Sequence, residues 1–385
     1  MSDFKELTIK DFAEVKGGKR LPKGIFVQDE PTNHPYIRVT DFEKDRLCED
    51  NIKYITDDVF EKIKRYIITD KDVYISIAGT IGLVGIIPKH LNNANLTENA
   101  AKICNINDLI MKHKYLMYYL RSINGQYEIQ SKVVGTSQPK LALYRIEEIK
   151  IKTPNIKSKD KIAKVLSNYD DLIENNNKRI NILEEMAQKI YKEWFVDFKF
   201  PNHETATFKQ TELGSEVMPK KGKNITKATI KEGNVPVVAG GIEPAYYHNV
   251  PNTVAPVITV SASGANAGYI NLYYQDIWAS DCSYIDATMT PYVYYYYLLL
   301  KYNQIKVTNM QRGAAQPHVY PQDLAQLKIK IPEEKVIGKF NEIITPFFSE
   351  ISNLSLKNQT LKQTRDRLLP RLISGEIDVE NLNIL

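Results

Sequence analysis

Two stretches of the chain, VVGTSQPKLALYRIEEIKIKTP at residues 133–154 and MQRGAAQPHVYPQDLAQLKIKIP at residues 310–332, carry nearly the same motif. When their Gln-Pro pairs are superposed, the copies are separated by 178 residues, the distance from Gln138 to Gln316. Seven positions are identical in this ungapped window, among them a glycine, the Gln-Pro pair, a Lys-Ile-Lys triplet and the final proline. Such a repeat indicates that the chain contains two copies of one structural unit.

A long helical pattern follows each copy at the same offset. Its positions recur at alternating steps of four and three, which is the a/d pattern of a coiled coil. The first seam is Ile162, Leu166, Tyr169, Ile173, Asn176, Ile180, Leu183, Ala187, Ile190 and Trp194. The second seam is Phe340, Ile344, Phe347, Ile351, Leu354, Asn358, Leu361, Arg365, Leu368 and Leu372. An amphipathic helix in a globular core is the alternative, but globular helices average only about three turns. Pro346 removes one helix hydrogen bond from the second pattern, so we expect that helix to kink or to start late.

The repeat also predicts how the two helices face each other. If they pack antiparallel about a pseudo-two-fold axis, with the first seam matched end to end, Asn176 and Asn358 are in side-chain contact. Such a pair satisfies its own hydrogen bonds and favours one register, at some cost in stability. The same register predicts three further pairs: Tyr169 with Arg365, Ala187 with Phe347, and Trp194 with Phe340. A cation–π contact is expected in the first of these pairs.

The segments before the two motifs contain short β-rich runs separated by Gly, Asn and Asp turns. We therefore predict an α+β fold, with two α/β domains in pseudo-two-fold repeat joined by two long antiparallel coiled-coil helices. The predicted parts are a first domain at 1–155, a helical spacer at 156–200, a second domain at 201–333 and a second helical spacer at 334–385. Tyrosine-rich stretches precede both motifs, at 114–122 and 291–300. We expect most of these tyrosines in the core, with base stacking as the alternative.

Composition sets the broad class. The 385 residues suffice for two or three domains, and 43% hydrophobic with 25% charged residues is typical of a water-soluble protein. The net charge of +5 suits an acidic partner, although a solvated surface explains it equally well. There is no signal-peptide pattern and no apolar stretch of about 20 residues, so no membrane association is expected. Three widely spaced cysteines indicate neither a disulfide framework nor a zinc site, which favours a reducing cytoplasm.

The sequence lacks the motifs of the common enzyme classes. It contains no dinucleotide fingerprint, no Walker loop, no Pro-Pro of the kind found in amino-directed methyltransferases, and no His or Cys spacing typical of metal ligands. The glycine-rich strings AGTIGLVG and SGANAG are more simply explained as tight turns than as phosphate loops. We therefore expect a binding protein without catalytic residues, cofactor or metal.

A duplicated binder suits duplex DNA, whose strands are related by local two-fold symmetry. Because the two domains differ in sequence, the two half-sites would differ as well, giving a bipartite and asymmetric target. A helix over residues 161–194 spans about 50 Å, enough to separate two domains by more than one DNA turn of ~34 Å.

With these features the chain resembles the specificity subunit of type I restriction–modification systems. The resemblance rests on the order of parts, the GTSQPK motif before a heptad helix, EEMAQKIYKEWFVDFKFP at residues 184–201, and TELGSEVMPKKG at residues 211–222. It covers essentially the whole chain and is most specific at the WFVDF sequence of residues 194–198. The chain departs from the pattern where His318 replaces Lys140 and where Pro346 interrupts the second helix, so the two DNA-facing loops need not be equivalent.

The resemblance implies two target-recognition domains that read double-stranded DNA, joined by helices that set the spacing. It implies two modification (methyltransferase) subunits as partners, which would bind S-adenosylmethionine and methylate adenine. Restriction subunits would join this complex to cleave DNA. The present chain would then direct recognition and host defence without catalysing a reaction itself.

The Gln-Pro motif supplies the first candidate DNA contacts. Gly135 permits a turn, Thr136 or Ser137 is expected to cap the following helix, and Pro139 suits its first turn. Gln138 is suited to adenine, and Lys140 to phosphate. The corresponding candidates in the second copy are Arg312, Gln316 and His318. The alternative is that each motif only caps a helix.

Two basic, glycine-containing stretches are further candidates. KGGKRLPKG at residues 16–24 contributes Lys19, Arg20 and Lys23, and PKKGKNITK at residues 219–227 contributes Lys221 and Lys223. Lysine and arginine in such loops suit phosphate, and plain solvated loops are the alternative. The turns at Gly79-Thr80 and at residues 261–266 are also expected to lie close to a DNA groove.

Two rival functions are consistent with the repeat. A coiled-coil scaffold with two globular heads and no DNA target is one, and a fused modification–recognition enzyme is the other. If the complex of this chain with its methyltransferase partner binds duplex DNA in a salt-sensitive way, the scaffold without a DNA target is excluded. Methylation by this chain alone would support the fused enzyme. The target bases and the spacer length cannot be deduced from the sequence.

Overall fold

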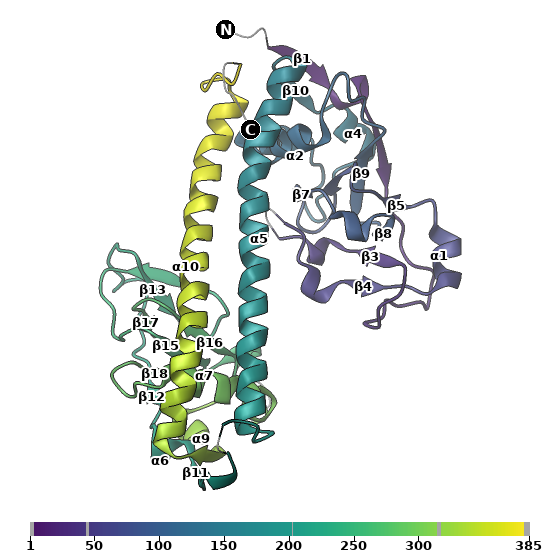
Figure 1. The fold of residues 1–385 in the computed structure, drawn as a ribbon. Coiled ribbons are helices and arrows are strands. Elements are labelled where there is room, and N and C mark those ends of the chain that lie inside the picture. The colour runs from purple at the N-terminus through teal and green to yellow at the C-terminus, as the bar shows by residue number, and fades with distance from the viewer. Residues whose placement is uncertain (1–3, 44–45, 202, 314–316, 381–385) are drawn as a thin grey trace. The chain divides into compact units, whose positions relative to one another are not determined.

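The computed structural model describes residues 4–43, 46–201, 203–313 and 317–380 (Figure 1). Its contacts divide the chain into two compact units. Unit 1 comprises Met1–Glu174 with Gln359–Leu385, and unit 2 comprises Asn175–Asn358. The boundary falls inside the two longest helices, α5 (Ile156–Phe195) and α10 (Glu334–Ile373). Each unit therefore contains one segment of each long helix, together with its own sheets and short helices.

Unit 1 is a mixed helix and sheet structure. Its strands are β1 (Lys5–Thr8), β2 (Glu14–Gly17), β3 (Pro35–Ile37), β4 (Lys53–Tyr54), β5 (Ile67–Ile68), β6 (Val73–Ser76), β7 (Val84–Gly85), β8 (Ala94–Leu96), β9 (Ala100–Cys104) and β10 (Lys150–Thr153). One antiparallel sheet has the order β2-β9-β6-β7, and a second has the order β4-β3-β8-β5 with β3 and β8 parallel. β1 pairs antiparallel with β10, directly before α5.

Short helices complete unit 1. They are α1 (Asp57–Ile63), α2 (His113–Arg121), α3 (Ile123–Ser131) and α4 (Leu143–Glu147), with 3-10 turns η1 (Ile9–Asp11), η2 (Val39–Asp41), η3 (Glu49–Asn51) and η4 (Lys89–Leu91). Helix α2 packs on the first sheet and on the long helices. Its buried face includes Tyr115 and Tyr118, and it shares a core with Leu166 of α5 and Leu372 of α10.

Unit 2 repeats this plan with other residues. Its strands are β11 (Phe208–Glu212), β12 (Lys220–Lys221), β13 (Val235–Val238), β14 (Tyr246–His248), β15 (Val257–Ser261), β16 (Ile270–Tyr273), β17 (Trp278–Ala279), β18 (Cys282–Asp286) and β19 (Lys328–Pro332). Its short helices are α6 (Leu213–Glu216), α7 (Val293–Tyr302), α8 (Gln304–Thr308) and α9 (Pro321–Ala325), with 3-10 turns η5 (His203–Thr205) and η6 (Gly264–Asn266).

The strand orders show that the repeat includes both heads. In unit 2 the antiparallel sheet has the order β12-β18-β15-β16, matching β2-β9-β6-β7. β13 and β17 pair in parallel as β3 and β8 do, and β11 pairs with β19 as β1 does with β10. Unit 1 has α1 and β5 in addition, so its head is larger than that of unit 2. The two heads thus share one topology, although their sequences look similar only near the motifs.

The tyrosine-rich helices lie in the cores, as predicted. On α7, Tyr295, Tyr296 and Tyr297 are buried among side chains of α10 such as Phe340. On α2, Tyr119 is buried as well. Consecutive tyrosines therefore fill the space between a sheet and the long helices, and these rings are not displayed for stacking on bases.

Helix α10 continues through Pro346, so the expectation of a late start is wrong. Proline has no backbone N–H, so the carbonyl of Glu342, four residues earlier, loses its helical donor. Ile344 and Phe348, on either side of the proline, are fully buried in the core of unit 2. Their burial favours the helix strongly enough to accommodate one missing hydrogen bond.

The two long helices run antiparallel within unit 2, because residue numbers fall along α10 as they rise along α5. Asn176 Nδ2 donates to Asn358 Oδ1 at 2.8 Å, which is the side-chain contact that the register predicts. The rings of Trp194 and Phe340 lie with centroids 5.6 Å apart, as the same register predicts. The third predicted pair in this unit, Ala187 and Phe347, belongs to the same hydrophobic core.

Unit 1 contains the remaining predicted pair. Arg365 Nη1 lies 2.5 Å from Asp170 Oδ1, and Arg365 Nη2 lies 2.8 Å from Asp366. Asp170 is the residue after Tyr169, so the antiparallel register holds here as well. These two carboxylates were not among the predicted contacts, and the cation–π contact of Arg365 with Tyr169 stays a prediction.

Candidate nucleic-acid interface

The Gln-Pro motif of unit 1 forms a closed loop. The N–H of Val134 donates to the carbonyl of Lys140 at 3.0 Å, and the N–H of Lys140 donates back at 2.9 Å. Gly135 has φ of +97°, a left-handed conformation that suits glycine and turns the chain at this point. Residues 135–140 are all exposed, so the side chains of Gln138 and Lys140 face solvent.

This geometry corrects the predicted helix cap. Thr136 and Ser137 do not cap a helix, and Pro139 does not lie in a first helical turn. The next helix is α4, whose N-cap residue is Ala142. The backbone groups on the two sides of the loop already satisfy each other, so the chain reverses at the motif instead of coiling. The candidate contact groups are therefore loop side chains and not helix amides.

A glycine turn lies against this loop. Ala78 forms a β-bridge with Lys140, and the N–H of Leu141 donates to the carbonyl of Ile77 at 3.0 Å. Gly79 has φ of +74°, and no atom lies within 4 Å of the place where its Cβ would stand. The structure thus brings together two stretches that the sequence analysis treated separately.

Unit 2 has the same arrangement. Arg312 and His318 exchange backbone hydrogen bonds of 2.8 and 2.9 Å, and His318 forms a second bridge with Ser263. Gly264, with φ of +78°, occupies the place that Gly79 holds in unit 1. Gln316, the counterpart of Gln138, lies outside the described residues.

The basic loop of unit 1 is held by a close backbone approach. The N–H of Gly18 donates to Ala100 at 3.0 Å, and the N–H of Lys19 donates to Leu96 at 2.8 Å. A Cβ on Gly18 would lie 2.0 Å from the carbonyl oxygen of Thr97, so only glycine fits at this position.

The basic loop of unit 2 is its structural counterpart. The N–H of Gly222 donates to Cys282 at 2.8 Å, and the N–H of Lys223 donates to Ala279 at 2.9 Å. A Cβ on Gly222 would lie 2.2 Å from the carbonyl oxygen of Ser280. The rough correspondence inferred from the two sequences therefore holds in the backbone.

All of these loops lie at one end of the central sheet of their unit. β2 and β6 end at Gly17 and Ser76, and β9, antiparallel to both, begins at Ala100. Since neighbouring antiparallel strands alternate in direction, these three termini share one sheet end. We call the loops of unit 1 rim 1 (residues 18–23, 77–82 and 134–140). We call the loops of unit 2 rim 2 (residues 222–223, 262–268, 312–313 and 317–318).

The predicted cations of both rims are on the surface. Lys19, Arg20, Lys23 and Lys140 of rim 1 are exposed, as are Lys223 of rim 2 and Lys221 directly before it. The guanidinium of Arg20 lies 2.7 Å from Glu98, with its side chain 81% exposed. Such an exposed pair is weakly held, so Arg20 can exchange its partner for a phosphate at little cost.

Arg312 has a different environment. Its guanidinium forms an ion pair with Asp323, whose side chain is only 6% exposed. The same carboxylate accepts the N–H of Tyr320 at 3.1 Å, at the start of α9. The ring of His318 stacks on Tyr320 with centroids 5.8 Å apart. Arg312 therefore joins rim 2 to α9 while its side chain stays 67% exposed, and its predicted DNA contact stays a prediction.

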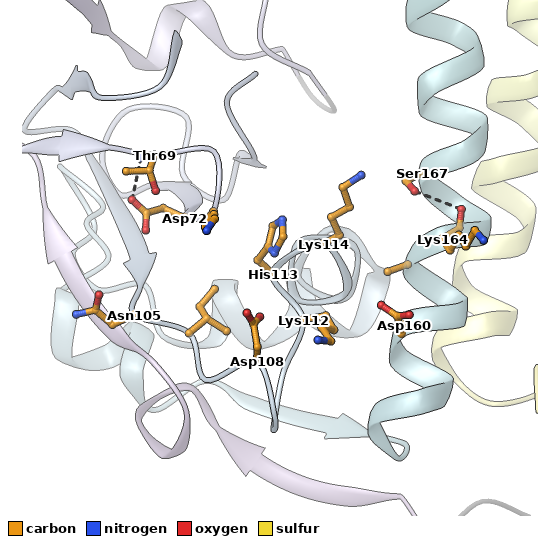
Figure 2. A pocket seen from close by; sticks show the side chains of 13 residues that line it. Thr69, Asp72, Asn105, Asp108, Lys112, His113, Lys114, Asp160, Lys164 and Ser167 are labelled. Carbon is orange, nitrogen blue, oxygen red and sulfur yellow. Dashed lines mark hydrogen bonds between the residues drawn. The ribbon is translucent and has the colours of Figure 1, made fainter. Parts of the chain in front are cut away.

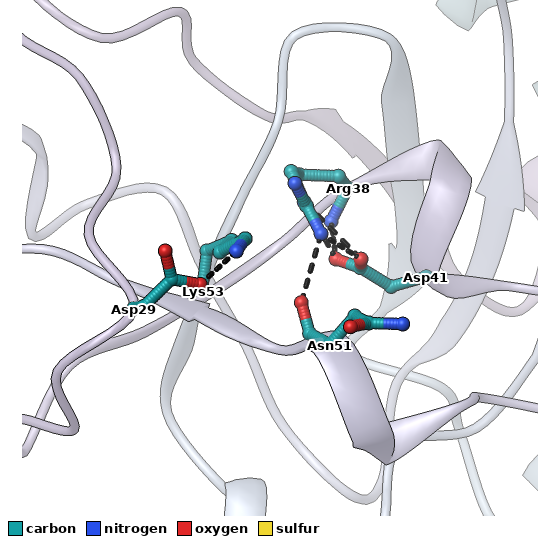
Figure 3. Close-up of polar contacts among 5 residues, drawn as sticks. All are labelled: Asp29, Arg38, Asp41, Asn51 and Lys53. Carbon is teal, nitrogen blue, oxygen red and sulfur yellow. Dashed lines mark hydrogen bonds and ion pairs between the residues drawn. The ribbon is translucent and has the colours of Figure 1, made fainter. Parts of the chain in front are cut away.

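A further arginine of unit 1 is structural. Arg38 follows β3, and its Nη2 donates to Asp41 at 2.5 Å and to the carbonyl of Asn51 at 2.9 Å, as Figure 3 shows. The carboxylate of Asp41 is buried, so the pair is held in place. The neighbouring pair of Lys53 and Asp29 is drawn in the same view. These contacts hold the chain in place around β3 and β4.

Sequence reasoning missed two exposed groups near rim 1. Phe26 is 85% exposed, while its neighbours Ile25 and Val27 pack inward on a small core. The guanidinium of Arg145 lies over the ring of Tyr144 at 5.6 Å, shortly after the Gln-Pro loop. The three consecutive apolar residues at 25–27 could have revealed the first, since neighbouring side chains of an extended chain point to opposite sides.

A hollow of about 570 Å³ lies between α2, α5 and the loops beside them in unit 1 (Figure 2). Its charged lining consists of Lys71, Asp72, Asp108, Lys112, His113, Lys114, Asp160 and Lys164. Burial lowers the pKa of His113. The hydroxyl of Ser167 donates to the carbonyl of Lys164 at 3.2 Å, and no hydrogen bond of the described residues joins His113 to a hydroxyl. The hollow therefore offers charge but no paired nucleophile and base.

The described residues contain no group of three or more His, Cys, Asp or Glu side chains that could hold a metal ion. Cys104 and Cys282 are buried, and burial raises the pKa of Cys282 to about 12, so its thiol is a poor nucleophile. Among the described helices, none is both long enough and apolar enough to span a membrane.

Comparisons with known proteins agree with this geometry. The family described as "Type I restriction modification DNA specificity domain" matches residues 1–185 and 202–363. The chain is 25% identical to the type I restriction enzyme MjaIX specificity subunit of Methanocaldococcus jannaschii, over 99% of this chain and 95% of that protein. It is 23% identical to the putative type I specificity subunit S.MpnORF638P of Mycoplasma pneumoniae, over 78% of this chain and 82% of that protein.

Among solved structures, the chain is similar to the S subunit of a type I restriction-modification system from M. genitalium. The TM-score is 0.64 at 18% identity, and the match covers 96% of both chains. This similarity shows the fold: two recognition domains of mixed helix and sheet, with long helices.

Proposed function

Because the chain belongs to the family of type I restriction–modification DNA specificity proteins, we propose that rim 1 and rim 2 are the surfaces with which it recognises DNA sequence. Each unit would read one half of a bipartite, asymmetric target. The observation that carries this proposal is the equivalence of the rims. In two units of different sequence, the same three loops gather at the same sheet end around Gly79 and Gly264 and around Gly18 and Gly222.

The chemistry of rim 1 suits a nucleic acid. Lys19, Lys23 and Lys140 would neutralise phosphates, and Gln138 has the paired donor and acceptor that adenine requires. Gly79 leaves open space, which permits close approach of a DNA backbone. Rim 2 would act in the same way with Lys223, aided by Lys221 at its base and with His318 in the place of Lys140.

The partners would supply the chemistry. The long helices of the chain would bind two methyltransferase subunits. These subunits would bind S-adenosylmethionine and methylate one adenine in each half-site. Restriction subunits would join the complex and cleave DNA. α5 and α10 would set the number of base pairs between the half-sites. This division of labour accords with the rims, whose candidate residues are cations, an amide and an imidazole on loops.

Methylation sequencing of a host with and without this chain tests the proposal. We expect one bipartite motif to lose its methylation when the chain is absent. Exchange of residues 1–135 for a homologous domain should change one half of that motif and leave the other intact. An unchanged methylome would contradict DNA recognition, and a change in both halves would contradict one half-site per unit.

A scaffold without a DNA target makes a different prediction for binding. The complex of this chain with its methyltransferase subunits should bind its target duplex with an affinity that falls steeply with salt. Retained assembly with no salt-sensitive DNA binding would favour the scaffold.

A further inference from the structure

A contact between side chains joins the recognition domain of unit 1 to the long helices, in addition to the bond from Lys159 Nζ of α5 to the carbonyl of Ile110 at 2.7 Å. The hydroxyl of Tyr118, on α2, donates to Asp170 Oδ2 of α5 at 2.5 Å. Arg365 of α10 donates from Nη1 to Asp170 Oδ1, also at 2.5 Å. The three side chains thus connect three helices through one carboxylate.

The contact is largely removed from water. Tyr118 is 2% exposed, and the side chains of Arg365 and Asp170 are 10% and 27% exposed. Burial, and then the charge of Asp170, raise the pKa of Tyr118 far above its ordinary value, so the phenol keeps the proton that it donates. Both carboxylate oxygens have a partner, and a charge-assisted hydrogen bond is both strong and directional.

Among the described residues of unit 2, no such contact occupies the equivalent place. At the offset of 178 residues, Asp170 corresponds to Phe348 and Arg365 to Ala187. Tyr294 of α7 stacks on Phe348 with centroids 4.5 Å apart, and Tyr297 meets the same ring edge-on at 5.8 Å. At this place the second domain therefore contacts the helices through apolar rings, which pack with far less directionality than a charged hydrogen bond. Its hydrogen bond from the Tyr292 hydroxyl to Glu334 of α10, at 3.1 Å, is exposed to solvent.

We propose that Tyr118 is a positioning residue: through Asp170 and Arg365 it fixes the angle of the first recognition domain on the long helices, and so sets the spacing between the half-sites. The inference rests on the proposed function. A domain held at one angle presents rim 1 at one distance along the DNA, and targets with a longer or shorter spacer are rejected. Loosening the contact leaves rim 1 unchanged but allows it to reach neighbouring spacings.

The experiment compares two tyrosines of the same helix. In Tyr118→Phe, Asp170 Oδ2 loses its donor. Tyr119→Phe is the matched control, because Tyr119 is also buried but its hydroxyl accepts from the N–H of Lys152 at 3.1 Å, inside the recognition domain. Each variant is assembled with its methyltransferase subunits. Methylation rates are then measured on duplexes with the native spacer, with one base pair more or fewer, and with one altered base in the first half-site.

We expect Tyr118→Phe to reduce the preference for the native spacer by about three- to tenfold, as the loss of one charge-assisted hydrogen bond allows. Rejection of the altered base should stay as in the native complex, and Tyr119→Phe should keep the native spacer preference. An unchanged preference in Tyr118→Phe, or an equal loss in both variants, would overturn the inference.

If Tyr118→Phe does not fold, Asp170→Asn keeps an acceptor for the phenol but removes the charge that Arg365 faces. An intermediate loss of spacer preference is then expected, and full retention would overturn the inference. Failure of the native complex to distinguish any base would instead contradict the proposed function, so the two failures are distinguishable.

Discussion

Asn176 and Asn358 meet side chain to side chain, with Nδ2 of the first donating to Oδ1 of the second at 2.8 Å. Asn358 Nδ2 in turn donates to Asn177 Oδ1, also at 2.8 Å. Both seam asparagines are less than a tenth exposed. A slipped register would place each amide against leucine or isoleucine and leave it without a hydrogen-bond partner. This pair therefore selects the antiparallel register of the long helices.

The asparagine pair predicts a contrast between single and double variants. Asn358→Leu alone strands the amide groups of Asn176 and Asn177, so we expect the free energy of unfolding to fall by about 1–3 kcal/mol. The double variant Asn176→Leu/Asn358→Leu leaves no stranded seam amide and should be near neutral or more stable. Urea denaturation measures both. A double variant less stable than the single one would show that the pair does more than fix the register.

The length of the long helices predicts the spacer. One heptad inserted after Glu174 in α5 and one before Gln359 in α10 would fall at the boundary of the two units. Seven residues add about 10 Å, so the preferred spacer should grow by about three base pairs. Insertion into α5 alone should abolish target methylation, because it breaks the register around Asn358. An unaltered spacer in the double insertion would show that the helices do not set the spacing.

The ion pair of Arg312 with Asp323 predicts that Arg312 and Lys140 differ in their effect on the salt dependence of DNA binding. Lys140→Gln should weaken binding of the target duplex and reduce the slope of log affinity against log salt by about one, because it removes a phosphate contact. Arg312→Gln should weaken binding without changing that slope, since this guanidinium holds rim 2 to α9. Binding titrations of the assembled complex across salt concentrations measure both. Equal slope changes would show that Arg312 contacts phosphate after all.

The close approach at the two basic loops predicts effects on separate half-sites. In Gly18→Ala a Cβ would lie 2.0 Å from a carbonyl oxygen, so the loop must move, at a cost of about 1–3 kcal/mol. We expect tolerance of base changes in the first half-site only. Gly222→Ala, with its Cβ 2.2 Å from Ser280, should relax the second half-site only. Each variant is the control of the other in a methylation assay on duplexes with one altered half-site.

The sequence by itself determined the repeat, the two long helices and their register. These follow from periodic patterns and from a constant offset between copies, and both are properties of the sequence alone. The position of Asn358 opposite Asn176 needed only the assumption of a pseudo-two-fold axis. Even the tyrosines of α7 could be assigned to the core, because consecutive residues on a helix cannot all face one surface.

Only the tertiary structure decided which loops come together and which charges are paired. Thr136, Ser137 and Pro139 have the local preferences of a helix start, yet the backbone exchange between Val134 and Lys140 turns them into a loop. Arg312 is a cation in a loop that was predicted to face DNA, but α9 places a buried carboxylate beside it. The partners in such contacts are distant in sequence. They meet because burial of the apolar strand faces sets the sheet register, and no local pattern records which loops that register brings to the same end.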